Sequence, residues 1–200
     1  GIGLGTLRTI DTPNHVKFTV FGKKYKRELV NLGVNEHNIS ITGPTIFDEI
    51  APLLQQERKK NEQLQIVLAT SPFIEDRFME KEVYFQRIEK ILGDIYTWDQ
   101  NAAITIKLHP REKNKGEYER ILASLGKSGI ITDEVDRTKH FNLINDCDLL
   151  ITFGSTVALE GMILQRPALT IELFDENNPT NKLIIGSGAS PVIKYDQDIA

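Results

Sequence analysis

The stretch Asp148–Gly161, with the sequence DLLITFGSTVALEG, decides the fold of this chain. Leu149, Leu150 and Ile151 form a continuous apolar run, which is typical of a parallel strand that is covered on both faces. Gly154 follows this run and allows the backbone to turn sharply or to approach a ligand closely. The stretch therefore predicts a buried strand, a tight turn and a helix.

The expected helix opens with two hydroxyl side chains, Ser155 and Thr156. Serine is a favoured N-cap residue, so we expect Ser155 to cap the helix and Thr156 to lie in its first turn. The free N–H groups and the positive dipole end at this position suit a phosphate. Glu160 lies beyond the capping-box position, on the same helix face as Thr156, and could reach a ribose. An ordinary strand-to-helix turn with a surface glutamate is the alternative.

Composition restricts the class of protein. The 200 residues are 40% hydrophobic and 26% charged, with a net charge of -4, which indicates a globular protein without the basic stripe of a nucleic-acid binder. The apolar runs are too short to cross a bilayer, and the first residues lack the apolar core of a signal peptide. Cys147 is the single cysteine, which excludes an internal disulfide and fits a cytoplasmic location.

Strand-like and helix-like segments alternate along the chain. This alternation predicts an α/β protein with a Rossmann-like, doubly wound parallel sheet and helices on both faces. The expected strands are 16–21, 39–42, 65–70, 103–108, 130–131, 149–151, 168–171 and 192–193. The expected helices are 23–32, 46–61 with an interruption at Pro52, 83–96, 118–125, 138–146, one from Ser155, and a helix start at 195–200.

Ligands of such sheets bind beyond the carboxyl ends of the strands, where the strand order reverses. Pro110 keeps His109 extended, so we expect the imidazole to reach this crevice and donate to a phosphate oxygen. Lys107 points to the same face of the sheet, and Arg111 could also meet an anion. A loop histidine without a ligand is the alternative. The candidate strand ends are Thr70-Ser71, His109-Pro110 and Gly154-Ser155-Thr156.

The other histidines give no sign of a metal site. His15, His37 and His140 have no partners at metal-ligand spacing, so we expect them to be structural or solvent-facing. We expect no bound metal and no cofactor. The acids Glu75 and Asp76 lie in a charged loop, and neither is assigned as a general base.

The order of these signals resembles the carboxyl-terminal, donor-nucleotide half of GT-B type glycosyltransferases. The groups with this resemblance are bacterial capsule and surface polysaccharide enzymes, polysialyltransferases and CDP-glycerol glycerophosphotransferases, and nucleotide-sugar 2-epimerases share the architecture. Acidic and arginine motifs typical of the 2-epimerases are not found, which favours a transferase. The matching pieces are Ile41-Thr42-Gly43-Pro44 with Phe47-Asp48, Lys107-Leu108-His109-Pro110, Asp148–Glu160 and Gln165-Arg166-Pro167.

The resemblance implies that a nucleotide-activated sugar or polyol donor binds in this half. His109 would be catalytic and would contact the phosphates together with Ser155 and Thr156, and Glu160 would contact the ribose. Thr70, Ser71, Pro110 and Gly154 complete the expected donor site.

The resemblance also implies a domain organisation. Residues 1–60 would be the remnant of an amino-terminal domain and its linker, and residues 61–200 the nucleotide-binding domain. The acceptor site and catalytic base would lie mostly in the amino-terminal half of a larger enzyme.

The expected function is therefore the donor-binding part of a glycosyltransferase or polyol-phosphate transferase in surface or capsular polysaccharide biosynthesis. Its partners would be a nucleotide-sugar donor and a glycan acceptor. Peripheral association with membrane polysaccharide machinery is compatible with this function. The alternatives are a nucleotide-sugar 2-epimerase-like enzyme and a non-catalytic nucleotide-binding module.

Overall fold

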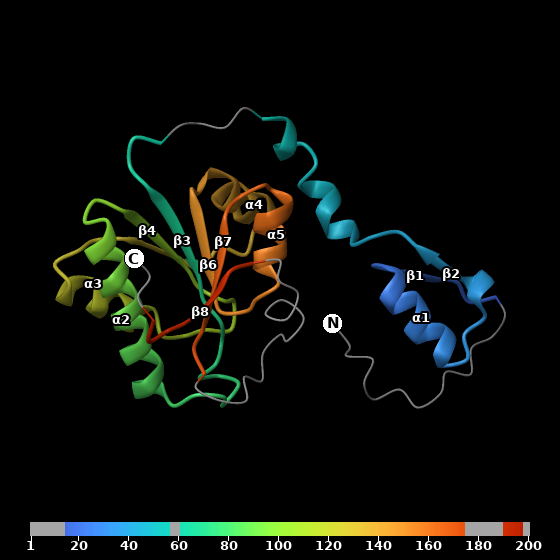
Figure 1. The fold of residues 1–200 in the computed structure, drawn as a ribbon, viewed down its shortest axis with the longest axis horizontal. Coiled ribbons are helices and arrows are strands. Elements are labelled where there is room, and N and C mark those ends of the chain that lie inside the picture. Colours follow the sequence, from blue (N-terminus) through green and yellow to red (C-terminus); the bar gives the residue numbers. More distant parts are fainter. Residues whose placement is uncertain (1–14, 57–60, 175–189, 198–200) are drawn as a thin grey trace. The chain divides into compact units, whose positions relative to one another are not determined.

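The computed structural model describes residues 15–56, 61–174 and 190–197. The chain divides into two compact units, Gly1–Ala51 and Pro52–Ala200, each of which has its own sheet (Figure 1). This division lies somewhat before the boundary expected after residue 60. The interpretation of the first unit as the remnant of a further domain remains a prediction.

The smaller unit is a strand–helix–strand motif. Strands β1 (Phe18–Val20) and β2 (Ile39–Ile41) pair in parallel, and helix α1 (Lys23–Asn31) connects them. Gly33 has a φ of +94°, a left-handed conformation that glycine adopts without strain, and it ends α1 as predicted. The core of this unit consists of Val20, Leu29, Val34 and Ile39.

The helix expected over residues 46–61 is not present in the described part of that segment. Two short 3-10 helices, Thr45–Glu49 and Leu53–Gln55, lie on either side of Pro52. Proline has no N–H to donate, and its ring disfavours a helical backbone at the preceding residue. Pro52 therefore separates two short helical segments, and the apolar spacing on either side of it does not form one α-helix.

The larger unit contains a six-stranded parallel sheet with the order β5-β4-β3-β6-β7-β8. The chain builds outward from β3 to β5, then returns to place β6 beside β3, and continues outward to β8. The strand order thus reverses between β3 and β6, where Ala69 pairs with Thr152. The predicted doubly wound, Rossmann-like sheet is confirmed. The strands are β3 (Gln65–Ala69), β4 (Ala103–Lys107), β5 (Ile130–Thr132), β6 (Leu149–Thr152), β7 (Ala168–Glu172) and β8 (Val192–Lys194).

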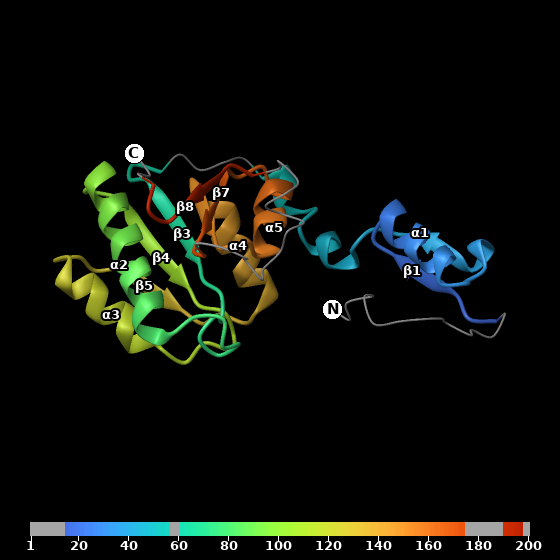
Figure 2. The same ribbon diagram turned by 60° about the horizontal axis from the view of Figure 1, so that its bottom comes forward.

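Four helices of the described residues cover this sheet. Figures 1 and 2 show α2 (Lys81–Trp98) and α3 (Lys115–Ser124) on one side of the sheet, and α4 (Arg137–Asp146) and α5 (Val157–Ile163) on the other. The helix expected to start at Tyr195 is not found, because residues 195–197 form a turn and residues 198–200 lie outside the described residues. No helix in the described ranges is long and apolar enough to span a membrane.

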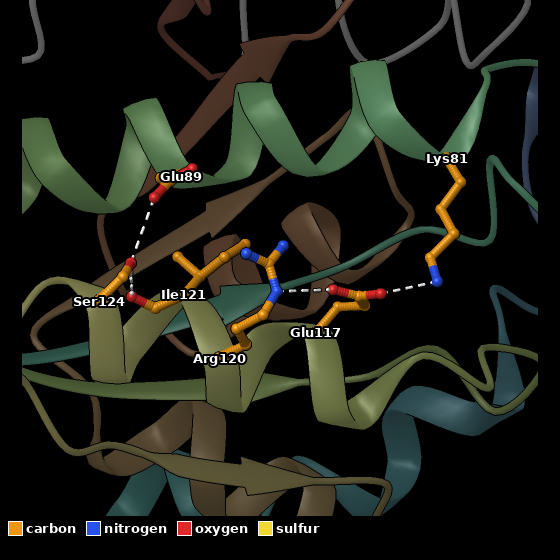
Figure 3. Close-up of polar contacts among 6 residues, drawn as sticks. All are labelled: Lys81, Glu89, Glu117, Arg120, Ile121 and Ser124. Atoms are coloured by element: carbon orange, nitrogen blue, oxygen red, sulfur yellow. Dashed lines mark hydrogen bonds and ion pairs between the residues drawn. The ribbon is translucent and has the colours of Figure 1, made fainter.

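Helices α2 and α3 are joined by polar contacts at their surface (Figure 3). Lys81 Nζ of α2 lies 2.7 Å from Glu117 Oε1 of α3, and within α3 Arg120 Nε lies 3.0 Å from Glu117 Oε2. Ser124 Oγ donates to Glu89 Oε1 at 3.2 Å. Such exposed contacts contribute little stability, so the buried apolar side of α2 is the main support of this packing. That side consists of Tyr84, Phe85, Ile88, Ile91, Leu92, Ile95 and Tyr96.

Candidate functional site

A pocket of about 220 Å³ lies at the carboxyl ends of β3 and β4 and at the turn between β6 and α5. It therefore occupies the point where the strand order reverses, as expected for a ligand site in this architecture. The structure brings all three candidate strand ends together there. The polar side chains that line the pocket are Thr70, Lys107, His109, His140, Ser155 and Thr156, and Pro110 lies beside them.

The turn after β6 presents the two hydroxyl side chains. Gly154 has a φ of +81°, so the predicted glycine turn is present, although Gly154 itself is not one of the described residues that line the pocket. Helix α5 begins at Val157, and Thr156 before it has a helical backbone and makes no side-chain capping hydrogen bond. The Val157 N–H donates to Ser155 Oγ at 3.3 Å. Ser155 therefore supplies the capping contact that was predicted for it.

His109 offers a defined donor to the pocket. The backbone N–H of Arg111 donates to His109 Nδ1 at 3.2 Å, so a neutral ring carries its proton on Nε2. Burial, together with the positive charges of Arg111 and Lys107, lowers the pKa of His109. At neutral pH the ring is therefore an uncharged Nε2–H donor. Arg111 itself is held away from this role by its ion pair with Asp76, in which Nη2 and Oδ2 lie 2.8 Å apart.

Lys107 places a positive charge in the wall of the pocket. Its side chain is buried, and Nζ donates to the carbonyl oxygen of Leu108 at 3.3 Å. Burial lowers the pKa of Lys107, and this effect is opposed by the carboxylates of Glu160, Glu112 and Glu134. A buried ammonium group that faces a polar pocket provides a favourable environment for an anion.

The polar side chains after β3 are buried or hydrogen-bonded within the protein. Thr70 Oγ1 hydrogen-bonds to Glu112 Oε2, and it also lies 3.2 Å from the carbonyl oxygen of Lys107. Ser71 is buried and is not one of the described residues that line the pocket. Binding of a nucleotide by these two residues remains a prediction, and no role was predicted for Glu112.

His140 and Glu160 form a pair at the edge of the pocket. His140 Nε2 lies 2.6 Å from Glu160 Oε2, and the two side chains are only 13% and 12% exposed. The expectation that His140 is structural or solvent-facing missed its place in the pocket wall. Glu160 is not one of the described lining residues, so contact of its carboxylate with a ribose remains a prediction. No spacing in the sequence could reveal this pair, because the two residues come from different helices.

Among the described residues, no group of three or more histidine, cysteine, aspartate or glutamate side chains is arranged to hold a metal ion. The polar wall of the pocket consists instead of nitrogen donors and hydroxyl groups. These groups suit a phosphate better than a cation.

The sequence profile of UDP-N-acetylglucosamine 2-epimerase matches residues 8–182. The chain belongs to the UDP-N-acetylglucosamine 2-epimerase family. This finding favours the 2-epimerase alternative over the predicted glycosyltransferase, whose transfer activity and capsule role are not confirmed. The chain matches this family although the acidic and arginine motifs expected of 2-epimerases were not found in its sequence.

Solved structures of this family share the fold. The UDP-GlcNAc 2-epimerase of Methanocaldococcus jannaschii is 16% identical, with a TM-score of 0.65 over 90% of this chain and 52% of that chain. The same enzyme in complex with UDP-GlcNAc and UDP is 20% identical, with a TM-score of 0.60 over 88% and 50%. The S. aureus MnaA–UDP structure is 15% identical, with a TM-score of 0.60 over 88% and 45%.

The chain thus spans about half the length of these solved structures. The wall teichoic acid polymerase TagF aligns with a TM-score of only 0.46, which is too low to support a transferase. No curated protein sequence matches this chain.

Proposed function

We propose that this chain is the nucleotide-binding half of a nucleotide-sugar 2-epimerase and that its pocket binds the diphosphate of a UDP-sugar. The observation that carries this proposal is the convergence of Lys107 and His109 with the hydroxyl groups of Ser155 and Thr156 on one cavity. The family match supports the reaction class. The UDP and UDP-GlcNAc bound in related structures support the choice of nucleotide.

Each pocket group has a separate task in this proposal. Lys107 supplies the positive charge, and because it is partly shielded from water its attraction to a diphosphate is stronger than at an exposed surface. His109 donates through Nε2–H, and Ser155 and Thr156 offer hydroxyl donors from the opposite side of the pocket. Such fixed donors stabilise charge that develops on the diphosphate during reaction. Helix α5 has only seven residues, so its dipole is a minor contributor.

The ribose contact predicted for Glu160 needs a different assignment. Its carboxylate is bonded to His140, which lines the pocket. Because His140 Nε2 faces this carboxylate and His140 Nδ1 is buried, we assign no hydrogen bond to the ligand to His140 and give Glu160 two supporting tasks. It fixes the orientation of the imidazole ring, and its negative charge favours the protonated form of Lys107.

Titration calorimetry of the intact chain tests the binding proposal. We expect UDP to bind and inorganic pyrophosphate to compete for the same pocket. Binding of UDP should weaken at least about 100-fold in the double variant His109→Ala/Ser155→Ala, because two hydrogen bonds to a charged group are lost. Arg120→Ala, which changes an exposed residue on α3, is the control and should bind as the parent does. Unchanged UDP binding in the double variant would overturn the site.

The reaction class is tested on the complete enzyme. An epimerase should convert UDP-N-acetylglucosamine to its 2-epimer without an acceptor, and in D₂O the product should carry deuterium at C2. Turnover that requires a glycan or polyol acceptor would instead indicate a transferase. A glycan acceptor and an association with membrane machinery remain predictions of the original transferase hypothesis.

A further inference from the structure

We propose that Glu112 is a positioning residue of this pocket, which joins the ends of β3 and β4 and thereby fixes the ring of His109. Its importance for nucleotide binding rests on the proposed function, whereas its effect on the His109 ring does not. Glu112 is not among the described residues that line the pocket, so it acts through Thr70 and His109, which are.

One carboxylate receives three donors from different parts of the fold. Glu112 Oε2 accepts the backbone N–H of His109 at 2.8 Å and the hydroxyl group of Thr70. Glu112 Oε1 accepts the hydroxyl group of Tyr118 at 2.7 Å. The carboxylate therefore connects the end of β3, the end of β4 and helix α3.

This connection extends into the core. The hydroxyl groups of Tyr118 and Tyr84 lie 2.9 Å apart, and both side chains are fully buried. Tyr84 belongs to α2, so the network anchors the pocket wall to both helices on that side of the sheet. Buried rings that hold their hydroxyl groups in place leave the Glu112 carboxylate little freedom to move.

The turn after β4 depends on the same residue. The backbone N–H of Glu112 donates to the carbonyl oxygen of His109 at 2.9 Å, and its side chain accepts the His109 N–H at 2.8 Å. His109 is thus held by Glu112 on both its amide and its carbonyl group. Arg111 lies within this turn, and its N–H donates to His109 Nδ1 at 3.2 Å, so by closing the turn Glu112 also favours the ring with its proton on Nε2.

This arrangement limits what the pocket can offer a ligand. The His109 amide is occupied by Glu112, and the single hydroxyl proton of Thr70 is directed within the protein. The groups left to bind an anion are therefore the ring of His109 and the other polar side chains of the wall. A change at Glu112 alters the pocket without removing any group that touches the ligand.

The test compares Glu112→Gln with Glu117→Gln in the intact chain. Glu117 is a second glutamate on this side of the molecule, and its partners are the exposed Lys81 and Arg120. Long-range ¹H–¹⁵N spectra of the histidine rings, assigned with His109→Gln, report the tautomer of His109. We expect a pure Nε2–H form in the parent and in Glu117→Gln, and a tautomer mixture in Glu112→Gln. UDP affinity should fall about tenfold in Glu112→Gln and stay within about twofold in the control.

Glu112→Asp is the second variant, in case Glu112→Gln does not fold. It keeps the charge but is too short to reach all three donors, so the tautomer mixture should also appear. An unchanged His109 spectrum in a folded Glu112 variant overturns the inference. If the parent chain binds no UDP, the proposed function fails, and the ring spectra still decide the role of Glu112.

Discussion

His140 Nε2 lies 2.6 Å from Glu160 Oε2, and this contact joins α4 to α5 beside the pocket. The Nδ1 atom of His140 is buried and has no hydrogen-bond partner within the described residues. A proton on Nδ1 would therefore be buried without an acceptor, which is costly. The ring accordingly donates from Nε2 to the carboxylate, and each partner satisfies a buried polar group of the other.

A double-mutant cycle measures this pair. We expect His140→Ala and Glu160→Ala each to lower the free energy of unfolding by about 1–3 kcal/mol, because each leaves a buried polar partner unsatisfied. The coupling energy from urea denaturation should be about 1–3 kcal/mol. The exposed pair Lys90–Asp94 on α2 is the control and should couple by less than about 0.5 kcal/mol. Equal coupling in the two cycles would contradict the pairing.

A second prediction tests whether the ring of His109 acts as a hydrogen-bond donor to the ligand. His109→Ala removes the Nε2–H donor, so UDP affinity should fall about tenfold or more. His109→Gln places an amide N–H near the same position and should recover part of the loss. Calorimetry on both variants makes the comparison. Equal affinity of the alanine and glutamine variants would show that the ring does not act as a hydrogen-bond donor.

The pKa of His109 predicts how stability depends on pH. Burial, with Arg111 and Lys107 nearby, lowers this pKa below its ordinary value of 6.5. Between the two values the unfolded chain binds more protons than the folded chain, so stability falls as the pH drops through this window and is retained above it. The glutamine in His109→Gln does not bind a proton in this pH range. The difference in unfolding free energy between parent and variant should therefore shift in favour of the variant as the pH falls below 6.5.

We expect replacement of Lys107 to raise the stability of the protein and to weaken its binding of an anion. Burial lowers the pKa of Lys107, which means that the folded state disfavours its charge at neutral pH. Lys107→Met keeps the apolar length of the side chain and removes that charge, so the thermal midpoint should rise. Affinity for pyrophosphate should fall about tenfold or more, because the buried positive charge is lost. A variant that binds pyrophosphate as tightly as the parent would remove Lys107 from the site.

The sequence predicted the elements that depend on local signals. The apolar run before Thr152 and the glycine at position 154 are sufficient to indicate β6 and its turn. The pairs Thr70–Glu112 and His140–Glu160 could not be predicted, because their members are 42 and 20 residues apart and meet only when the sheet has formed. The strand-end motifs indicate a ligand site in a doubly wound sheet, but a fold of this kind does not specify the reaction. The sequence signals therefore predicted the fold correctly, but they favoured a transferase over the 2-epimerase alternative that the family match supports better.

Gly161 explains why α5 can lie so close to β6. A Cβ atom at this position would come within 2.6 Å of Leu150 Cδ2, and Leu150 is fully buried in the strand. Gly161→Ala gains about 1 kcal/mol of helix propensity but overpacks the core by about 1–3 kcal/mol, so a net loss of stability is expected. The double variant Gly161→Ala/Leu150→Val removes the clashing methyl group and should be more stable than the sum of the two single changes. Urea denaturation of the four proteins gives this coupling, and strict additivity would show that Leu150 moves aside without strain.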